Sequence, residues 1–91
     1  MSETERIREV LMQLASERRA GCTFCPSEAA RRLSADWRPL MSRVREVAAE
    51  LMEEGKLVCM QRGEPAHPLA TRGAIRLAIR VPLESTGERQ T

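Results

Sequence analysis

The apolar residues of this 91-residue chain recur with a helical period near the N-terminus. Four of them are spaced at i, i+3, i+4 and i+7, which is one face of a helix: Ile7, Val10, Leu11 and Leu14. Ser2 and Glu5 form the S-x-x-E pattern of a capping box just before this face. Gly21 follows it as a stop signal. The pattern predicts a first helix over about residues 3–19.

Two further helical segments are predicted after this helix. Pro26 is acceptable at the first position of a helix, and Ser27 to Leu33 continue it as a short second helix. After a three-residue break, a broad apolar stripe at helical spacing predicts a third helix over about residues 37–54, with Asp36 as its N-cap and Gly55 as its end. The apolar members of this stripe are Trp37, Leu40, Met41, Val44, Val47, Ala48, Leu51 and Met52.

The hydrophobic period changes to that of β-structure after the third helix. Residues 56–61 are a candidate strand, and residues 75–81 alternate with apolar side chains at odd numbers. Between them, residues 62–73 contain two prolines and two glycines and are predicted to be a loop. Near residues 22–24, Thr23-Phe24 can pair as a minimal third strand.

This order of elements predicts an α+β fold that is mainly α. Two helices joined by a short break form a helix-turn-helix, and a hairpin follows at once, which is the winged-helix topology with residues 62–73 as the wing. We expect one such domain over residues 1–82 and a polar tail over 83–91. A bare three-helix fold with an unstructured C-terminal part is the alternative, and the alternation of residues 75–81 argues against it.

Composition places the chain among small globular proteins. Hydrophobic residues make up 42% of it, too many for a disordered chain. No apolar run approaches the roughly 20 residues of a membrane span, and the N-terminus has no apolar signal region. The three cysteines, an odd number, fit a reducing compartment. We therefore expect a cytoplasmic protein that does not contact membranes.

Charge is distributed unevenly, although the net charge is only +2. Residues 56–80 contain one acid, Glu64, and five bases: Lys56, Arg62, Arg72, Arg76 and Arg80. Nearly all bases in the chain are arginine, which a GC-rich genome would also explain. The excess nevertheless makes the C-terminal half of the domain a candidate surface for phosphates.

The predicted third helix has the charge pattern of a DNA-recognition helix. Its bases lie in the N-terminal half and its acids in the C-terminal half, opposite to what the helix dipole favours. Helical spacing places Arg38, Ser42, Arg45 and Ala49 on one exposed face, where unpaired arginine donors could read bases. Arg43 lies on the other flank, within reach of Glu46, and is a candidate for a salt bridge or a phosphate contact.

The predicted DNA-contacting residues are therefore Arg38, Ser42, Arg43, Arg45, Arg62 and Arg72. Arg62 and Arg72 stand at the two bases of the wing, while Arg76 and Arg80 share one face of the last strand. Arg31 and Arg32 on the second helix are further candidates for backbone contacts. Ordinary solvation of these charged faces is the alternative in each case.

Cys22 and Cys25 form a C-x-x-C pattern, but its chemistry depends on the segment between them. If Cys22 to Phe24 is extended, the two Cα atoms lie about 10 Å apart, beyond the roughly 7 Å that a disulfide tolerates. We therefore expect neither a redox pair nor a metal site. At a helix N-terminus the Cys25 thiol would be the most reactive if exposed, whereas a buried cap is the alternative.

No constellation of residues predicts catalysis. His67 is the only histidine, and nothing orients it as a base toward Cys59. We expect no enzyme activity, cofactor or small-molecule substrate. Phe24 and Trp37 are the only aromatic residues and are expected in the core, which disfavours the stacking that single-stranded nucleic acids require.

Several stretches resemble a known bacterial family. They are "CPSEAARRL", "DWRPLMSRVREVAAELMEEGKL", "MQRG" and "RGAIRL", and they look like domain-of-unknown-function family 3253. The resemblance runs from the first helix to the last strand. It implies a winged-helix fold and no established activity.

Two functions of different classes follow from these patterns. The first is binding of double-stranded DNA through the third helix and the wing, as in a transcriptional regulator. The second is a protein-interaction module without DNA binding, in which the acidic C-terminal half of the third helix and the hairpin edge contact a protein partner or a second copy of the chain.

Overall fold

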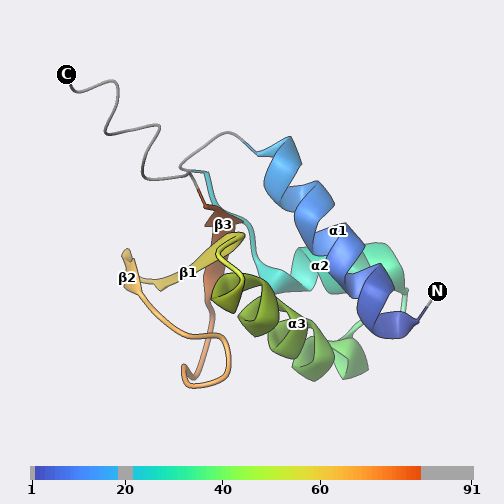
Figure 1. Ribbon diagram of the computed structural model, residues 1–91. Helices are drawn as coiled ribbons and strands as arrows, with labels where there is room; N and C mark the ends of the chain where they lie inside the picture. Colours follow the sequence, from blue (N-terminus) through green and yellow to red (C-terminus); the bar gives the residue numbers. More distant parts are fainter. Residues whose placement is uncertain (1, 19–21, 81–91) are drawn as a thin grey trace.

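The fold is α+β and mainly α, with three α-helices beside a small antiparallel sheet (Figure 1). The computed structural model describes residues 2–18 and 22–80. Its elements are α1 (Glu3–Glu17), α2 (Pro26–Leu33), the 3₁₀ turn η1 (Arg38–Leu40), α3 (Met41–Glu53), β1 (Leu57–Gln61), β2 (Glu64–Pro65) and β3 (Arg76–Ile79). The predicted Gly21 stop, the last residue of the predicted strand and the predicted tail over 83–91 lie outside the described residues.

The first helix begins at the predicted capping box. The Ser2 Oγ accepts a 3.1 Å hydrogen bond from the Glu5 backbone N–H, and a Glu5 carboxylate oxygen accepts one of 3.2 Å from the Ser2 N–H. The predicted apolar face of α1 is directed into the core, because Ile7, Leu11 and Leu14 are all buried. The position and the face of this helix are therefore confirmed.

The start of the third helix differs from the prediction. The chain enters α3 through η1, and the Trp37 carbonyl accepts a 2.9 Å hydrogen bond from the Leu40 N–H. Asp36 is not the N-cap. The residue that precedes η1 as its cap is Trp37, whose backbone is already in the right-handed helical region. The Asp36 N–H instead donates to the Ser34 Oγ at 3.1 Å. A local Ser34 turn thus replaces the expected cap.

The predicted end of the third helix is confirmed. Gly55 has a φ of +80°, and its N–H donates to the Met52 carbonyl at 3.0 Å. The Lys56 N–H donates to the Leu51 carbonyl at 2.9 Å. This pair of bonds is a Schellman motif, which requires a left-handed residue at the position of Gly55 and turns the chain directly into β1.

The sheet has the strand order β2-β1-β3, and both pairings are antiparallel. β2 corrects the prediction that residues 62–73 are a loop throughout. Arg62 and Gly63, with φ values of +55° and +82°, form a two-residue turn that pairs Gln61 with Glu64. Positive φ at both central positions matches the twist of a tight hairpin, which the proline and glycine content of the segment concealed.

A residue before α2 joins the far edge of the sheet. Phe24 exchanges two backbone hydrogen bonds of 2.8 Å with Leu77 of β3, which makes a single β-bridge where a minimal strand was predicted. β3 buries Leu77 as predicted, but Ala78 is also buried, so the predicted strict alternation fails there. Ala78 pairs with Val58 of β1, and its methyl group needs little space.

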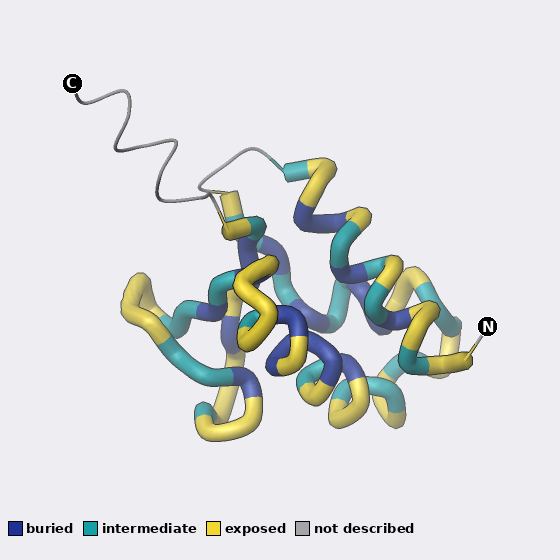
Figure 2. Tube along the Cα trace, viewed as in Figure 1, coloured by how far each residue is buried: buried dark blue, intermediate teal, exposed yellow. Residues whose placement is uncertain are grey.

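One hydrophobic core lies between the three helices and the sheet (Figure 2). Phe24 is fully buried in it, as expected. Trp37 only packs against its margin and remains half-buried, so the expectation of a core tryptophan is met in part. Within the described part of the chain, no helix has the length and apolar character to cross a membrane.

Candidate nucleic-acid interface

Arg45, one of the two arginines predicted to read bases, holds a loop against α3. Its guanidinium donates to the carbonyls of Pro68 at 3.0 Å and Thr71 at 2.9 Å, and also to the Gly73 carbonyl. The side chain is half-buried. The prediction that its donors are unpaired is therefore wrong. The physical reason is that the β2–β3 loop (residues 66–75) folds back onto α3, which spacing along a helix cannot reveal.

The predicted exposed face of α3 is accordingly narrower than expected. Ala49 is only 3% exposed, and Arg45 is tied to the β2–β3 loop. Arg38 and Ser42 remain exposed on this face. They lie at η1 and the first turn of α3, which is the end that a helix-turn-helix would direct toward a binding partner.

Arg38 lies over the ring of Trp37, with its guanidinium carbon 4.6 Å from the ring centroid. Arg31 of α2 lies over the same ring at the same distance. Both arginine residues are exposed. Two cations from different helices thus meet on one aromatic side chain at the turn between α2 and α3.

Arg43 forms the salt bridge that the sequence predicted. Its guanidinium lies 3.8 Å from a Glu46 carboxylate oxygen and 3.9 Å from one of Glu3 on α1. These distances are long for ion pairs, and the side chains are about half exposed. Arg43 therefore stays accessible to an anion in spite of its acidic neighbours.

The two predicted hairpin arginines are both exposed. Arg62 occupies the β1–β2 turn, and Arg72 lies in the β2–β3 loop between two of the residues that bind Arg45. The Gln61 side chain donates to the carbonyls of Arg72, at 2.7 Å, and Ala74, at 3.2 Å. The loop is therefore fixed from β1 as well as from α3, and Arg72 is presented from an ordered backbone.

The remaining strand and helix arginines have other partners or positions. The Arg76 guanidinium donates to the Thr23 Oγ1 at 2.9 Å and to the Thr23 carbonyl at 3.2 Å. Arg32 forms a bidentate pair with Glu17, both bonds being 3.0 Å long. Arg80, which follows β3, is exposed.

Most of the arginines that form ion pairs connect α1 to other elements. The pairs tie α1 to its neighbours: Arg8 to Glu54, Arg18 to Glu28, Arg32 to Glu17 and Arg43 to Glu3. By contrast, no carboxylate among residues 2–18 and 22–80 pairs with Arg31, Arg38, Arg62 or Arg72. These four cations lie at the α2–α3 turn and on the hairpin. Arg6 of α1 and Arg80 after β3 are also exposed without a carboxylate partner among the described residues.

Two of the ion pairs also shift the pKa values of their members. Hydrogen bonding from Arg32 lowers the pKa of Glu17, and hydrogen bonding from Arg8 lowers the pKa of Glu54. The pKa values of Arg32 and Arg8 are raised by the same bonds. These carboxylates are therefore held in their charged form, as ties between helices.

The three cysteines are free thiols in three different environments. Cys22 is exposed. Cys25 is half-buried, and its sulfur accepts a 3.1 Å hydrogen bond from the Ser27 hydroxyl. Burial raises the pKa of the Cys59 thiol, which Arg45 only partly opposes. Phe24, which lies between Cys22 and Cys25 in the chain, forms the bridge with Leu77.

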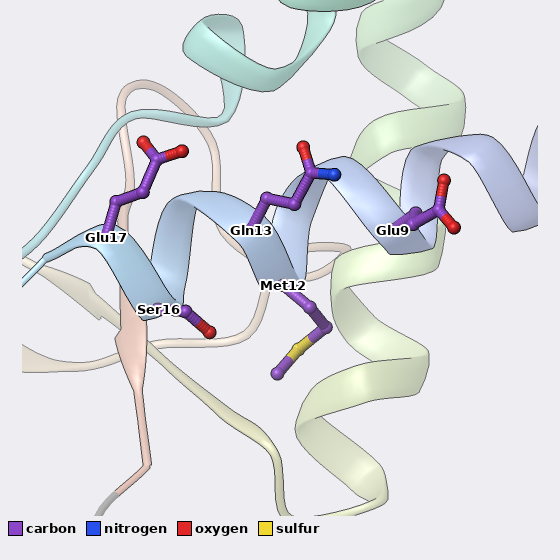
Figure 3. A pocket seen from close by; sticks show the side chains of 5 residues that line it. All are labelled: Glu9, Met12, Gln13, Ser16 and Glu17. Atoms are coloured by element: carbon purple, nitrogen blue, oxygen red, sulfur yellow. The ribbon is translucent and has the colours of Figure 1, made fainter.

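Two hollows of the surface differ in their linings. A depression of about 470 Å³ is lined by five residues of α1 alone, so it is a surface along one helix (Figure 3): Glu9, Met12, Gln13, Ser16 and Glu17. A second hollow of about 410 Å³ lies between the end of α3 and the hairpin. Its lining is mostly apolar and includes Met52, Val58, Met60 and, as its one charged residue, Arg80.

Sequence reasoning missed two features of this interface. One is the stacking of Arg31 on Trp37. The only signal for it in the sequence was the seven-residue spacing between Arg31 and Arg38. The other is the role of Arg45 in holding the β2–β3 loop. The lack of an acid at i+3 or i+4 signalled that Arg45 had no partner on its own helix, but it could not indicate a partner 23 to 28 residues away.

Comparison with known proteins agrees with the resemblance found in the sequence. Among curated proteins, none matches this chain. A family model described as "Protein of unknown function (DUF3253)" matches residues 4–80, which includes every helix and strand of the structure apart from the first residue of α1. The chain therefore belongs to the DUF3253 family.

Proposed function

We propose that this protein binds double-stranded DNA through the start of α3 and the hairpin, as a winged-helix module. One observation supports the proposal most strongly. The guanidinium groups without a carboxylate partner, among the described residues, include Arg38, Arg62 and Arg72, which come from the turn before α3 and from the hairpin. These cations lie near the two ends of α3 (Figure 1). Duplex DNA is an extended polyanion that can contact both groups at once, whereas a small anion cannot.

The order of the elements supports the same proposal. α2, η1 and α3 form two helices joined by a short turn, and the antiparallel hairpin follows α3 directly. In DNA-binding proteins of this arrangement, the N-terminal residues of the second helix face the major groove. Ser42 and Arg38 occupy that end, so we assign them contacts in or beside the groove.

Arg45 has a positioning role in this proposal and makes no contact with DNA. By binding three carbonyls of the β2–β3 loop, it sets the position of Arg72 relative to α3. Arg62 and Arg72 would contact phosphates from the hairpin, and Arg43 would contact one from α3. A single module of this size buries a small interface, so we expect micromolar or weaker affinity on random duplex at physiological salt.

The proposal is tested by measuring affinity for a random duplex over a series of salt concentrations. For B-DNA, the slope of log K against log salt is about −0.9 per neutralised phosphate. The double variant Arg62→Gln/Arg72→Gln should therefore flatten the slope by about 1.8. The control variant Arg8→Gln/Arg32→Gln removes the same charge from arginines already paired with acids, and its slope should stay near that of the wild type.

Absence of binding by the wild type at low salt would refute the proposal. Equal slopes for the two double variants would show that net charge alone determines binding, and would remove the hairpin from the interface.

A second candidate function is an interaction with a protein partner. It is favoured by the mostly apolar hollow between α3 and the hairpin, which lies next to the acidic C-terminal half of α3. A partner segment with apolar and basic residues would complement this surface. Two results together would favour this second function. The wild-type protein would not bind duplex DNA at low salt, and it would bind a protein partner that the variant Met60→Glu no longer binds.

A further inference from the structure

The stacked group at the α2–α3 turn consists of Arg31, Trp37 and Arg38, and we call it the arginine–tryptophan cluster. Both guanidinium carbons lie 4.6 Å from the Trp37 ring centroid, a typical cation–π distance. The two guanidinium carbons are consequently no farther apart than twice that distance. Trp37 packs against the core margin, so its ring is held by the fold while the two arginine residues remain exposed.

Stacking on the ring leaves the N–H donors of each guanidinium group free. It engages the flat face of the group, whereas the N–H donors lie along its edge. Among the residues the structure describes, neither Arg31 nor Arg38 donates a side-chain hydrogen bond or pairs with a carboxylate. Two arginine forks are thus held in place with their donors available, which is the arrangement that recognises phosphate oxygens bidentately.

The surrounding charge favours an anion. Residues 29–45 contain five arginines and a single acid, Asp36. Asp36 is exposed and forms no ion pair among the described residues. Of the other three arginines in this segment, Arg32 is paired with Glu17 and Arg45 with loop carbonyls. Arg43 is accessible but lies beside the carboxylates of Glu3 and Glu46, so the cluster is the cationic site of this segment without an acidic partner among the described residues.

We infer that the arginine–tryptophan cluster binds the phosphodiester backbone of DNA, beside the end of α3 that faces the groove. This inference rests on the proposed function, and it adds Arg31 and Trp37 to the interface. It also changes the role of Arg38, which contacts backbone phosphate in place of a base edge. Trp37 is a positioning residue here, because it holds the two guanidinium groups without touching the ligand.

The test compares variants that remove charge with variants that remove only the ring. Arg31→Gln/Arg38→Gln should flatten the salt slope on random duplex by about 1.8, since two phosphate contacts are lost. Trp37→Leu keeps every charge but removes the stacking surface, and it should weaken affinity about fivefold. Trp37→Phe restores an aromatic ring and should recover most of that loss. Thermal unfolding of each variant verifies that it is folded before binding is measured.

The charge-matched control is again Arg8→Gln/Arg32→Gln. If this control and Arg31→Gln/Arg38→Gln have the same salt slope while the wild type binds DNA, the inference is wrong and the proposed function stands. If the wild type does not bind DNA, both are wrong. If Trp37→Leu and Trp37→Phe bind as tightly as the wild type, Trp37 has no positioning role and the cluster is not the unit that binds.

A separate arm distinguishes backbone phosphate from a small phosphate ligand. Trp37 is the only tryptophan and the chain has no tyrosine, so its fluorescence reports on the cluster directly. At constant ionic strength, duplex DNA should change this emission at concentrations where inorganic phosphate has no effect. Saturation by inorganic phosphate at micromolar concentration, without competition from duplex, would overturn the assignment to DNA.

Discussion

At the scale of single residues, Arg45 shows how one side chain can connect elements far apart in the sequence. Its guanidinium has five N–H donors, and three loop carbonyls accept from it. Arg43, two residues earlier, carries the same charge but stays exposed beside two acids. The difference between the two lies entirely in which face of α3 the β2–β3 loop covers.

This contrast predicts different effects of substitution at the two positions. Arg45→Met keeps an unbranched side chain and helix propensity but leaves three carbonyls without their donor. We expect it to lower the free energy of unfolding by about 1.5–3 kcal/mol, the range for hydrogen bonds to charged groups. Arg43→Met should change it by less than about 1 kcal/mol, as for exposed ion pairs.

Urea unfolding of both variants measures this difference, and amide exchange locates it. Exchange should accelerate in the β2–β3 loop of Arg45→Met and remain unchanged in α1. Similar losses of stability in the two variants would contradict the inference that Arg45 holds the β2–β3 loop against α3.

At the scale of elements, the β1–β2 hairpin combines a strained backbone with an exposed charge. Arg62 has a φ of +55°, the left-handed region that costs a residue with a side chain about 1–2 kcal/mol. Asparagine and glycine are the usual residues of such a turn. An arginine there fits a functional role for its side chain, since strain is often retained where a residue acts.

We therefore expect that a substitution which relieves the strain at Arg62 will raise stability and weaken DNA binding. Arg62→Asn should raise the free energy of unfolding by about 1 kcal/mol, and so the melting temperature by roughly 4–8 °C. The same variant should weaken duplex binding, because a phosphate contact is lost. Thermal unfolding and the salt series measure the two effects.

Arg72→Asn is the matched control, because it removes the same charge at a residue without positive φ. It should weaken binding without raising the melting temperature. A melting temperature of Arg62→Asn equal to or below that of the wild type would show that the turn is not strained.

At the scale of the whole molecule, ion pairs connect α1 to its neighbouring helices, whereas the α2–α3 turn and the hairpin carry cations without a carboxylate partner among the described residues. Glu17 pairs with Arg32 and Glu54 with Arg8, which links α1 to both neighbouring helices. The pKa values of both glutamates are lowered by these bonds. A carboxylate whose pKa is lower in the folded state stabilises the fold above its unfolded-state pKa.

The expected pH dependence follows from that sign. The stabilisation by Glu17 and Glu54 is complete at neutral pH and is lost as the pH falls through their lowered folded-state pKa values. The variant Glu17→Gln/Glu54→Gln should melt below the wild type at neutral pH and lose less on acidification. Melting temperatures of the two proteins between neutral and acidic pH measure this. If the melting temperatures of the two proteins fall in parallel with pH, the two glutamates do not cause the loss of stability in acid.

The local elements could largely be predicted from the sequence. The apolar period of α1, the S-x-x-E cap and the glycine after α3 depend on neighbours within about one helical turn, and the structure confirms all three. The hairpin was predicted in outline, although β2 was hidden because a two-residue strand has no period of its own.

For the candidate site, most of the residues could be predicted from the sequence, but their contacts could not. The sequence identified Arg38 as an exposed cation because no acid follows it at helical spacing, and Arg62 and Arg72 because they lie at the bases of the predicted wing, and all three are exposed. It also assigned Arg45 to them by the same reasoning, which failed because the partner carbonyls come from the β2–β3 loop. Spacing along one helix gives the direction of a side chain but not what covers it.

The sequence by itself therefore determined the elements, their order and the arginine-rich character of the turn and the hairpin. Only the tertiary structure decided which arginines are engaged, with Arg45 fixed to the β2–β3 loop and Arg31 brought beside Arg38 over Trp37. The physical reason is range. Helical period and caps act between residues three or four apart, whereas hydrogen bonds and cation–π contacts depend on distance in space after the chain has folded.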